Sequence, residues 1–114
     1  NTKPAIFGVR VSGGKLIKNL HMINEEGEKV GNIKNIQHEK NSVNESHEGD
    51  EVAISIPNLN YERQMKGKKY IYSDTSESQF RNFKENKDLL TGTEMQILKE
   101  ISGIKRKEKP EWGV

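Results

Sequence analysis

The spacing of apolar residues changes at Asp74, and this change constrains the fold more than any other feature of the sequence. Before Asp74, short segments such as residues 5–11 and 52–56 alternate apolar and polar side chains with a period of two. After Asp74, apolar residues recur at intervals of three and four, which is the period of an α-helix. The chain is therefore expected to be mainly β with C-terminal helices.

Six short strands are expected before Asp74, because polar turns separate the apolar segments. They are placed at residues 5–11, 16–22, 29–37, 52–56 and 70–72, with one short strand near Val43 inside the polar loop 38–50. The spacing of Val30, Ile33 and Ile36 breaks the alternation, which indicates a bulge. A helix is the alternative for residues 29–37, although Gly31 weakens it. The whole pattern is typical of a β-barrel or a β-sandwich.

Two helices are expected after Asp74. Ser76 with Gln79, and Thr91 with Glu94, form the capping-box pattern that begins a helix. Apolar residues follow at helical spacing: Phe80, Phe83 and Leu90 after the first box, and Ile97, Leu98, Ile101 and Ile104 after the second. The helices are expected to pack against each other, against the β part, or both. Residues 1–73 and 74–114 are therefore expected to be two parts of one structural domain.

Composition limits the classes of protein that the chain can belong to. Its 114 residues are enough for one core, and 31% are apolar while 32% are charged. Cysteine is absent, which excludes disulfides, thiolate metal sites and thiol catalysis and fits a reducing, cytoplasmic setting. No apolar run reaches the roughly 20 residues that cross a bilayer. Residues 1–4 contain neither a signal-peptide pattern nor an initiating Met, so the chain is expected to be a piece of a longer protein.

The charge balance bears on nucleic-acid binding. The formal net charge is +2; residues 1–73 carry 11 basic and 9 acidic side chains, and residues 74–114 carry 8 of each. A protein that binds nucleic acid mainly by neutralising phosphates is usually far more basic. Any contact with nucleic acid is therefore expected to be local and dependent on shape.

No motif for catalysis or metal binding stands out. Residues 8–15, GVRVSGGK, approach a phosphate-binding loop, but Gly14 separates the second glycine from Lys15 and Leu16 replaces the Ser or Thr that reaches magnesium. His21, His38 and His47 lack the spacing of metal ligands. We expect no catalytic residue and no metal site, and a hydrolase would need convergent polar side chains that only folding could bring together.

Two polar segments allow more than one interpretation. Arg63 and Gln64 could donate to a phosphate, a carboxylate or a base edge, although an exposed loop arginine is usually only solvated. The basic side chains at residues 105–109 could bind a partner, or could simply oppose the helix dipole. Trp112 could dock onto the β part or wait for a partner, and the sequence leaves both open.

Several segments, taken in order, resemble the C-terminal domain of translation initiation factor 5B, the archaeal and eukaryotic relative of bacterial initiation factor 2. They are residues 4–9, PAIFGV; 27–37, GEKVGNIKNIQ; 49–56, GDEVAISI; Arg63 with Gln64; and 104–114, from IKRK to PEWGV. The resemblance covers nearly the whole chain and its C-terminal segment is archaeal in style.

This resemblance implies a closed β-barrel of the translation-protein type, followed by two α-helices, at one end of a multidomain GTPase. In that family the barrel holds the aminoacylated acceptor end of initiator methionyl-tRNA, and the factor promotes joining of the ribosomal subunits. GTP and magnesium would then belong to the parent protein, with no cofactor in this chain. The implied partners are initiator tRNA, the ribosome and initiation factor 1A, without a membrane, and the fragment is expected to be monomeric.

The resemblance also implies which residues contact the tRNA end. They are Gln37, His38, Gly49, Glu51, Val52 and Ala53, together with Arg63 and Gln64. A glycine before a strand lets a ligand approach the backbone, and Val52 with Ala53 could form a shallow apolar site for a methionine side chain. His38 could stack on a terminal base. An ordinary strand start is the alternative for residues 49–53.

A second function hypothesis concerns the helices. Phe80, Phe83, Leu98, Ile101 and Trp112 could present an apolar surface to another initiation factor such as factor 1A. The sequence therefore predicts either a tRNA-end-binding module, a protein-docking module, or both on different surfaces.

Overall fold

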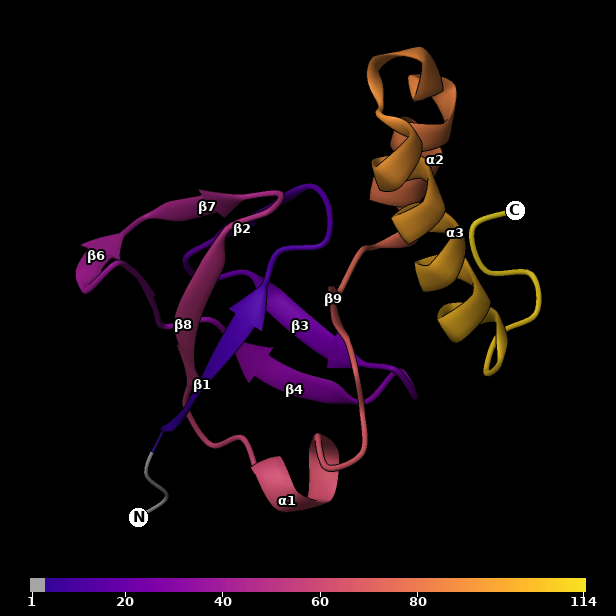
Figure 1. Ribbon diagram of the computed structural model, residues 1–114. Helices are drawn as coiled ribbons and strands as arrows, with labels where there is room; N and C mark the ends of the chain where they lie inside the picture. The colour runs from indigo at the N-terminus through magenta and orange to yellow at the C-terminus, as the bar shows by residue number, and fades with distance from the viewer. Residues whose placement is uncertain (1–3) are drawn as a thin grey trace. The chain divides into compact units, whose positions relative to one another are not determined.

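The computed structural model describes residues 4–114 and is mainly β with C-terminal helices (Figure 1). The backbone forms two compact units, of which the first, the β unit, ends at Asp74 and the second, the helical unit, is Thr75–Val114. Residues 1–3, on which the expectation of a missing signal peptide partly rests, lie outside the described part. No helix of residues 4–114 is long and apolar enough to cross a membrane.

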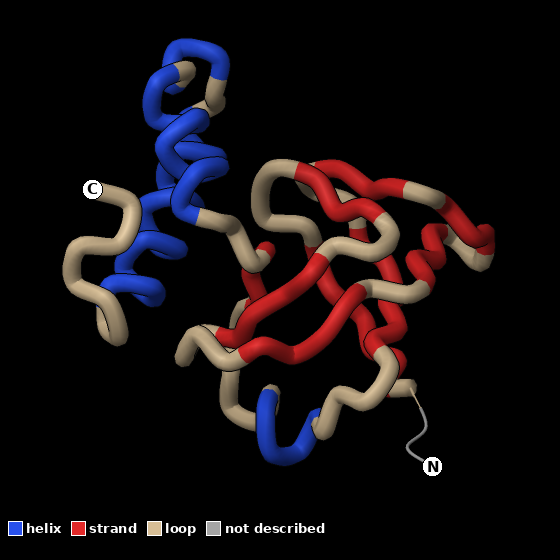
Figure 2. Tube along the Cα trace, turned by 180° about the vertical axis from the view of Figure 1, so that it is seen from behind, coloured by secondary structure: helices blue, strands red, loops and turns tan. Residues whose placement is uncertain are grey.

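The β unit contains nine strands and one short helix among its described residues, which Figure 2 shows in red and blue. The strands are β1 Ala5–Arg10, β2 Lys15–Ile17, β3 His21–Asn24, β4 Lys29–Asn32, β5 Asn35–His38, β6 Asn41–Val43, β7 Glu45–His47, β8 Glu51–Ile56 and β9 Ile71–Ser73, and the helix is α1 Tyr61–Gln64. They form three antiparallel sheets, ordered β1-β8-β5-β6, β2-β7 and β4-β3-β9.

One hydrophobic core joins the three sheets. Alternate residues of β1 and β8 point inward, as the period of two requires, and Val52, Ile54 and Ile56 are at most 5% exposed. The same cluster takes buried residues from β3, β4 and β5 and from the segment around α1: Met22, Val30, Ile36, Leu59 and Met65. Leu16 of β2 and Ile71 of β9 pack against it. Burial of each such side chain stabilises the fold by about 1.5–3 kcal/mol.

The structure corrects the strand count from six to nine in the described β unit. The expected strand 16–22 is divided into β2 and β3 at Asn19, whose φ is 71°. The expected strand 29–37 is divided into β4 and β5, and the polar loop 38–50 holds β6 and β7 rather than one strand. The breaks after β2 and after β5 contain residues with positive φ, Asn19 and the pair Glu39 and Lys40, which the apolar pattern does not reveal.

The predicted bulge is present in residues 29–37. The register of β3 with β4 steps from Met22 opposite Gly31 to Ile23 opposite Lys29, so Val30 is the additional residue. Gly31 has φ 114°, and a Cβ there would lie 2.9 Å from Cγ2 of Ile56. The bulge therefore needs glycine for both its backbone angle and its close contact with the core.

The helical unit follows the predicted capping signals. Helix α2 spans Glu77–Glu85, the 3-10 helix η1 spans Lys87–Leu89, and α3 spans Gly92–Arg106. Ser76 and Thr91 both accept from the backbone three residues later, and Gln79 and Glu94 bond back to the cap residue. Both predicted capping boxes are confirmed.

The last residues of the chain fold back on the helical unit. Trp112 is 7% exposed, and its ring centroid lies 4.9 Å from that of Phe80 in α2. Arg106 Nε donates to the Trp112 carbonyl at 2.7 Å. Trp112 is thus part of the core of the helical unit, a position that differs from both alternatives that the sequence left open.

Candidate nucleic-acid interface

An open depression with a volume of about 590 Å³ lies on the outer face of sheet β1-β8-β5-β6. Its centre is a row across three strands, because Ala53 of β8 is opposite Gly8 of β1 on one side and Gln37 of β5 on the other. We call this the sheet depression. It is lined by Gly8, Val9, Arg10, Gln37, Glu39, Lys40, Glu51, Val52 and Ala53.

Small side chains make the floor of the sheet depression low. Gly8 has no side chain and Ala53 has one methyl group, so the backbone of two adjacent strands lies close to the surface. Val52 is 5% exposed and belongs to the core, which leaves Ala53 as the member of the pair whose side chain is on the outer face. A flat or extended ligand can therefore approach the sheet closely.

Charges of both signs surround this floor. Arg10 is opposite Glu51 in the β1–β8 register, and Glu39 with Lys40 forms the turn between β5 and β6. The φ angles of Glu39 and Lys40 are 52° and 71°, in the left-handed region that glycine and asparagine usually occupy in such turns. Holding such residues there costs about 1–3 kcal/mol each, which the rest of the fold offsets.

The structure brings together four of the predicted tRNA-contact residues and leaves two at its side. Gln37, Glu51, Val52 and Ala53 line the sheet depression. His38 ends β5 and is half-buried, with Nε2 4.0 Å from Oε1 of Glu39. Gly49 lies in the exposed turn before β8, where its N–H donates to the Val11 carbonyl at 2.8 Å. Neither His38 nor Gly49 lines the depression.

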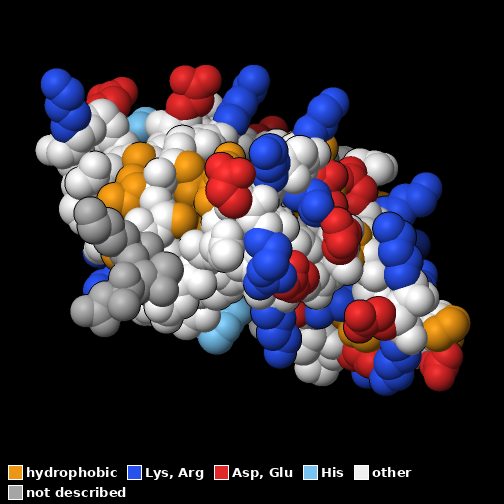
Figure 3. All heavy atoms as spheres, turned by 90° about the horizontal axis from the view of Figure 1, so that it is seen from below, with side chains coloured by type: hydrophobic (Ala, Val, Ile, Leu, Met, Phe, Trp, Pro, Cys, Tyr) orange, Lys and Arg blue, Asp and Glu red, His pale blue; other side chains and the backbone are white. Residues whose placement is uncertain are grey.

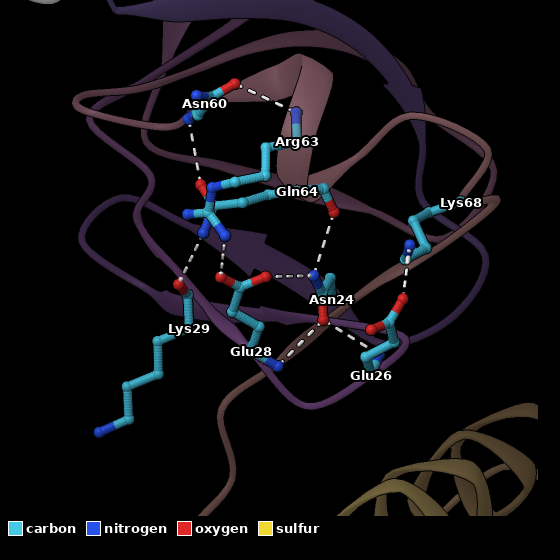
Figure 4. A network of polar contacts seen from close by, with 8 residues as sticks. All are labelled: Asn24, Glu26, Glu28, Lys29, Asn60, Arg63, Gln64 and Lys68. Carbon is cyan, nitrogen blue, oxygen red and sulfur yellow. Dashed lines mark hydrogen bonds and ion pairs between the residues drawn. The ribbon is translucent and has the colours of Figure 1, made fainter.

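Arg63 and Gln64 are positioned elsewhere, in α1, and both have partners inside the β unit (Figure 4). Arg63 Nη1 donates to Oε2 of Glu28 at 2.8 Å. Gln64 is 7% exposed; its Oε1 accepts from the Asn60 N–H at 3.0 Å and its Nε2 donates to the Lys29 carbonyl at 3.3 Å. These contacts hold α1 against the hairpin of β3 and β4, while the Arg63 side chain remains 63% exposed.

Asn24 and two ion pairs complete this polar network. Asn24 is 1% exposed; its Nδ2 donates to the Gln64 carbonyl at 3.0 Å and its Oδ1 accepts from the N–H groups of Glu26 and Glu28. The Arg63 hydrogen bond is the main reason that the pKa of Glu28 is lowered, and hydrogen bonding to Glu26 raises the pKa of Lys68. This network could not be predicted from the sequence, because its residues are up to 44 positions apart.

The residues predicted to bind a partner protein divide by burial. Phe80, Ile101 and Trp112 are at most 7% exposed and pack inside the helical unit, and Leu98 is half-buried. Phe83 is 39% exposed, and Leu89 and Met95, which the sequence did not single out, are 82% and 46% exposed. The exposed large apolar side chains of this unit are therefore Phe83, Leu89, Met95 and Val114 rather than the buried residues.

Glu77 ties the C-terminal segment to α2. It lies 2.6 Å from Nζ of Lys109 and 2.7 Å from Nη2 of Arg81. The hydrogen bond from Lys109 is the main cause of the lowered pKa of Glu77. These charged contacts fix the segment that carries Trp112.

Sequence reasoning missed Gly8, Arg10, Glu39 and Lys40. The alternation in residues 5–11 puts Gly8 and Arg10 on the outer face, but the pairing of β1 with β8 is not encoded locally. Residues 39 and 40 lack the Asn-Gly signal of a tight turn.

No three His, Asp or Glu side chains of residues 4–114 group as metal ligands would. On the face drawn in Figure 3, acidic and basic side chains are interspersed.

Comparison with known proteins places this architecture in a family. Residues 1–72 match the family model of elongation factor Tu domain 4. The chain is 41% identical over 114 residues to a probable translation initiation factor IF-2 from Methanopyrus kandleri, and 36% identical over 113 residues to one from Archaeoglobus fulgidus. These matches cover 99% and 98% of this chain but 19% of each relative, so the chain spans about a fifth of their length.

A solved structure gives the same result. The crystal structure of GDP-bound aIF5B from Aeropyrum pernix matches 98% of this chain and 19% of that chain, with a TM-score of 0.82 and 26% sequence identity. The resemblance to initiation factor 5B seen in the sequence is confirmed over both units. The chain belongs to the elongation factor Tu domain 4 family, and over nearly its whole length it is similar to archaeal translation initiation factors IF-2 and aIF5B.

Proposed function

We propose that this chain is the C-terminal domain of a translation initiation GTPase and that its β unit binds the aminoacylated acceptor end of initiator methionyl-tRNA. The observation that carries the proposal is the sheet depression, with its low floor and its charged surroundings, in a chain of this family. The parent protein would bind GTP and magnesium, act on the ribosome in the cytoplasm and support subunit joining. This chain would contribute binding and no catalysis.

The chemistry of the sheet depression suits such a ligand. An aminoacyl ester carries an α-ammonium group, which Glu51 or Glu39 can pair with, and the adjacent phosphates are anions that Arg10 and Lys40 can contact. Ala53 and the glycine at position 8 leave room for the ester close to the strand backbone. Gln37 can donate to the ribose or the carbonyl. His38 and Gly49, at neighbouring turns, would extend the contact.

Barrel closure is part of the same proposal. The three sheets share one core, and a closed barrel of the translation-protein type would bring their remaining edges together. In that arrangement the sheet depression would be a rigid outer surface, which is what recognition of a small ester requires.

The proposal is tested by titrating the chain with methionyl initiator tRNA and with the same tRNA lacking its amino acid, at low salt. We expect tighter binding of the aminoacylated form, and Glu51→Gln should reduce that preference because it removes the partner of the ammonium group. Glu85→Gln, on an exposed carboxylate of α2 that does not line the sheet depression, is the matched control. Equal affinity for both tRNA forms would contradict the proposal.

A second candidate function is docking of another initiation factor, such as factor 1A, on the helical unit. The exposure of Phe83, Leu89 and Met95 favours it. A chemical-shift titration with factor 1A should move amides in Thr75–Val114. Undisturbed amides throughout that unit would exclude this function.

A further inference from the structure

Two stretches of the sequence contain no acidic residue, residues 1–24 and residues 29–38. All nine acidic side chains of residues 1–73 lie outside these stretches, which carry six of the eleven basic ones. In the rest of residues 1–73 the two signs of charge are interspersed. The two stretches are therefore where the positive charge of the β unit is least compensated by the sequence.

The fold brings one lysine from each stretch together. The Asn19 N–H donates to the Ile33 carbonyl at 2.7 Å. This hydrogen bond joins the peptide group that follows Lys18 to the peptide group that precedes Lys34. The backbones of the two lysines therefore lie side by side, although sixteen positions separate them in the sequence.

The contact continues along both chain segments. The Ile33 N–H donates to the Leu20 carbonyl at 3.0 Å, and His21 is opposite Asn32 in the β3–β4 register. The two segments thus run antiparallel as neighbours, without an acidic residue in either. We call this surface the basic band, and it consists of residues 18–21 and 32–34.

The charges of Lys18 and Lys34 are not paired within the chain. Lys18 is half-buried and Lys34 is exposed, and neither forms an ion pair with a carboxylate of residues 4–114. Two carboxylates flank the band. Glu45 already lies 3.5 Å from Nζ of Lys15, and Asp74 adjoins the band through its N–H, which donates to a carbonyl of the band at 2.8 Å. The lysines of the band are thus available to an external anion.

The basic band offers polar groups rather than apolar anchors. Ile33 is 0% exposed and Leu20 packs against the core, whereas Asn19 and Asn32 are exposed. Amide side chains donate to phosphate oxygens and to ribose hydroxyls, and lysines neutralise phosphates. A protein partner would instead need apolar or aromatic residues to anchor it. The chemistry of the band therefore suits the sugar-phosphate backbone of RNA.

We propose that the basic band binds the backbone of a folded RNA, with Lys18 and Lys34 each neutralising a phosphate and with Asn19 and Asn32 contacting phosphate or ribose. No residue of the band lines the sheet depression, so this inference goes beyond the proposed function. The helical stem of a tRNA and a helix of ribosomal RNA share this chemistry, and the experiments below distinguish them.

The first test measures binding of the chain to a short blunt-ended RNA duplex, which has no unpaired end for the sheet depression, over a series of salt concentrations. The double variant Lys18→Gln, Lys34→Gln should bind the duplex more weakly. The slope of the logarithm of the binding constant against the logarithm of the salt concentration should become shallower by about 1 for each lysine.

The matched control is the double variant Lys66→Gln, Lys69→Gln, which removes the same charge from exposed lysines outside the basic band. It should leave the salt slope nearly unchanged. An equal change in both double variants would show that binding follows only the overall charge, and the inference would be wrong. Failure of the wild-type chain to bind the duplex at low salt would also overturn it.

The second test identifies the source of the RNA. The wild-type chain and the Lys18→Gln, Lys34→Gln variant are titrated with uncharged initiator tRNA and, separately, with isolated ribosomal subunits. Weaker binding of the variant to tRNA assigns the band to the tRNA stem, and weaker binding to the subunits assigns it to ribosomal RNA. If the variant binds both as tightly as wild type does, the inference is wrong.

The proposed function has a separate readout in the same experiments. The Lys18→Gln, Lys34→Gln variant should keep the preference of the wild-type chain for methionyl tRNA over uncharged tRNA, because the sheet depression is unchanged. Absence of that preference in the wild-type chain overturns the proposed function alone. Its loss only in the variant would place the band at the tRNA end, which overturns the inference.

Discussion

The carboxylate of Glu28 joins the turn between β3 and β4 to α1. Arg63 Nη1 donates to Oε2 at 2.8 Å, and Asn24 Nδ2 donates to Oε1 at 3.2 Å. These donors favour the charged form and hold the pKa of Glu28 below its ordinary value of 4.5. A lowered pKa in the folded state means that the stabilisation is complete above about pH 4.5 and is lost as the pH falls through the folded-state pKa.

Arg63→Ala should therefore destabilise the β unit near neutral pH, and the difference from wild type should shrink as the pH falls from about 6 to about 3. The measurement is urea unfolding followed at the amide signals of β3 and β8. Lys66→Ala is the control, because the Lys66–Glu62 ion pair is largely exposed on both sides and contributes little. A difference that does not change with pH would show that Arg63 stabilises α1 without acting through Glu28.

For single residues, the sequence identified side chains that can donate hydrogen bonds, but it did not identify their partners in the fold. Arg63 and Gln64 have the chemistry to contact a tRNA, but their donors meet Glu28 and the Lys29 carbonyl, which are 35 residues away in the sequence. Such distant pairings depend on the tertiary fold, so local patterns could not reveal them. A direct tRNA contact by these two residues stays a prediction.

The helical unit depends on one turn near the C-terminus. Gly113 has φ 74°, and a Cβ there would lie 2.7 Å from Cδ2 of Phe80. Gly113→Ala should destabilise this unit by about 1–3 kcal/mol, because alanine is strained at positive φ and would displace the ring. Trp112 is the only tryptophan of the chain, so its fluorescence reports the unfolding of this unit directly.

Gly103→Ala provides the opposite case in the same unit. Gly103 lies inside α3, and a Cβ there would meet nothing within 4 Å. The substitution should stabilise the unit by about 0.5–1 kcal/mol, because alanine loses less conformational entropy in a helix. If Gly113→Ala left the stability of the helical unit unchanged or raised it, the turn described at Gly113 would be wrong.

Helices and strands could be predicted from the sequence where the residues that specify them lie close together in the chain. The two capping boxes lie within four residues of chain, and both helices began where the boxes predicted. Helix α1 and the turn between β5 and β6 were missed: α1 has only four residues, and Glu39 and Lys40 adopt positive φ without a glycine or an asparagine. Tertiary packing overrides local preference at these positions.

For the molecule as a whole, the small net charge predicts how tRNA binding should depend on salt. Arg10 and Lys40 are the cations that line the sheet depression, so about two phosphates would be neutralised. The logarithm of the binding constant should then fall with the logarithm of the salt concentration with a slope of about −1.4. A titration series over salt measures this slope. A much steeper slope would indicate a broad phosphate-binding surface outside the depression.

The order of the strands in the sheet was not predictable from the pattern of apolar residues. Strand β1 pairs with β8, more than forty positions away, and this pairing creates the row of Gly8, Ala53 and Gln37. The resemblance to initiation factor 5B supplied Gln37, Glu51 and Ala53, whereas the residues of β1 and of the β5–β6 turn came only from the fold. The change from strands before Asp74 to two helices after it was predicted directly, because the spacing of apolar residues changes there from two to three and four.

The most direct test of the account is amide chemical-shift mapping with a methionylated acceptor-stem minihelix of the initiator tRNA. The account predicts shifts at Gln37, Glu51 and Ala53, which line the sheet depression. Shifts centred on α1, or confined to Thr75–Val114, would contradict the assignment of the tRNA end to the outer face of sheet β1-β8-β5-β6.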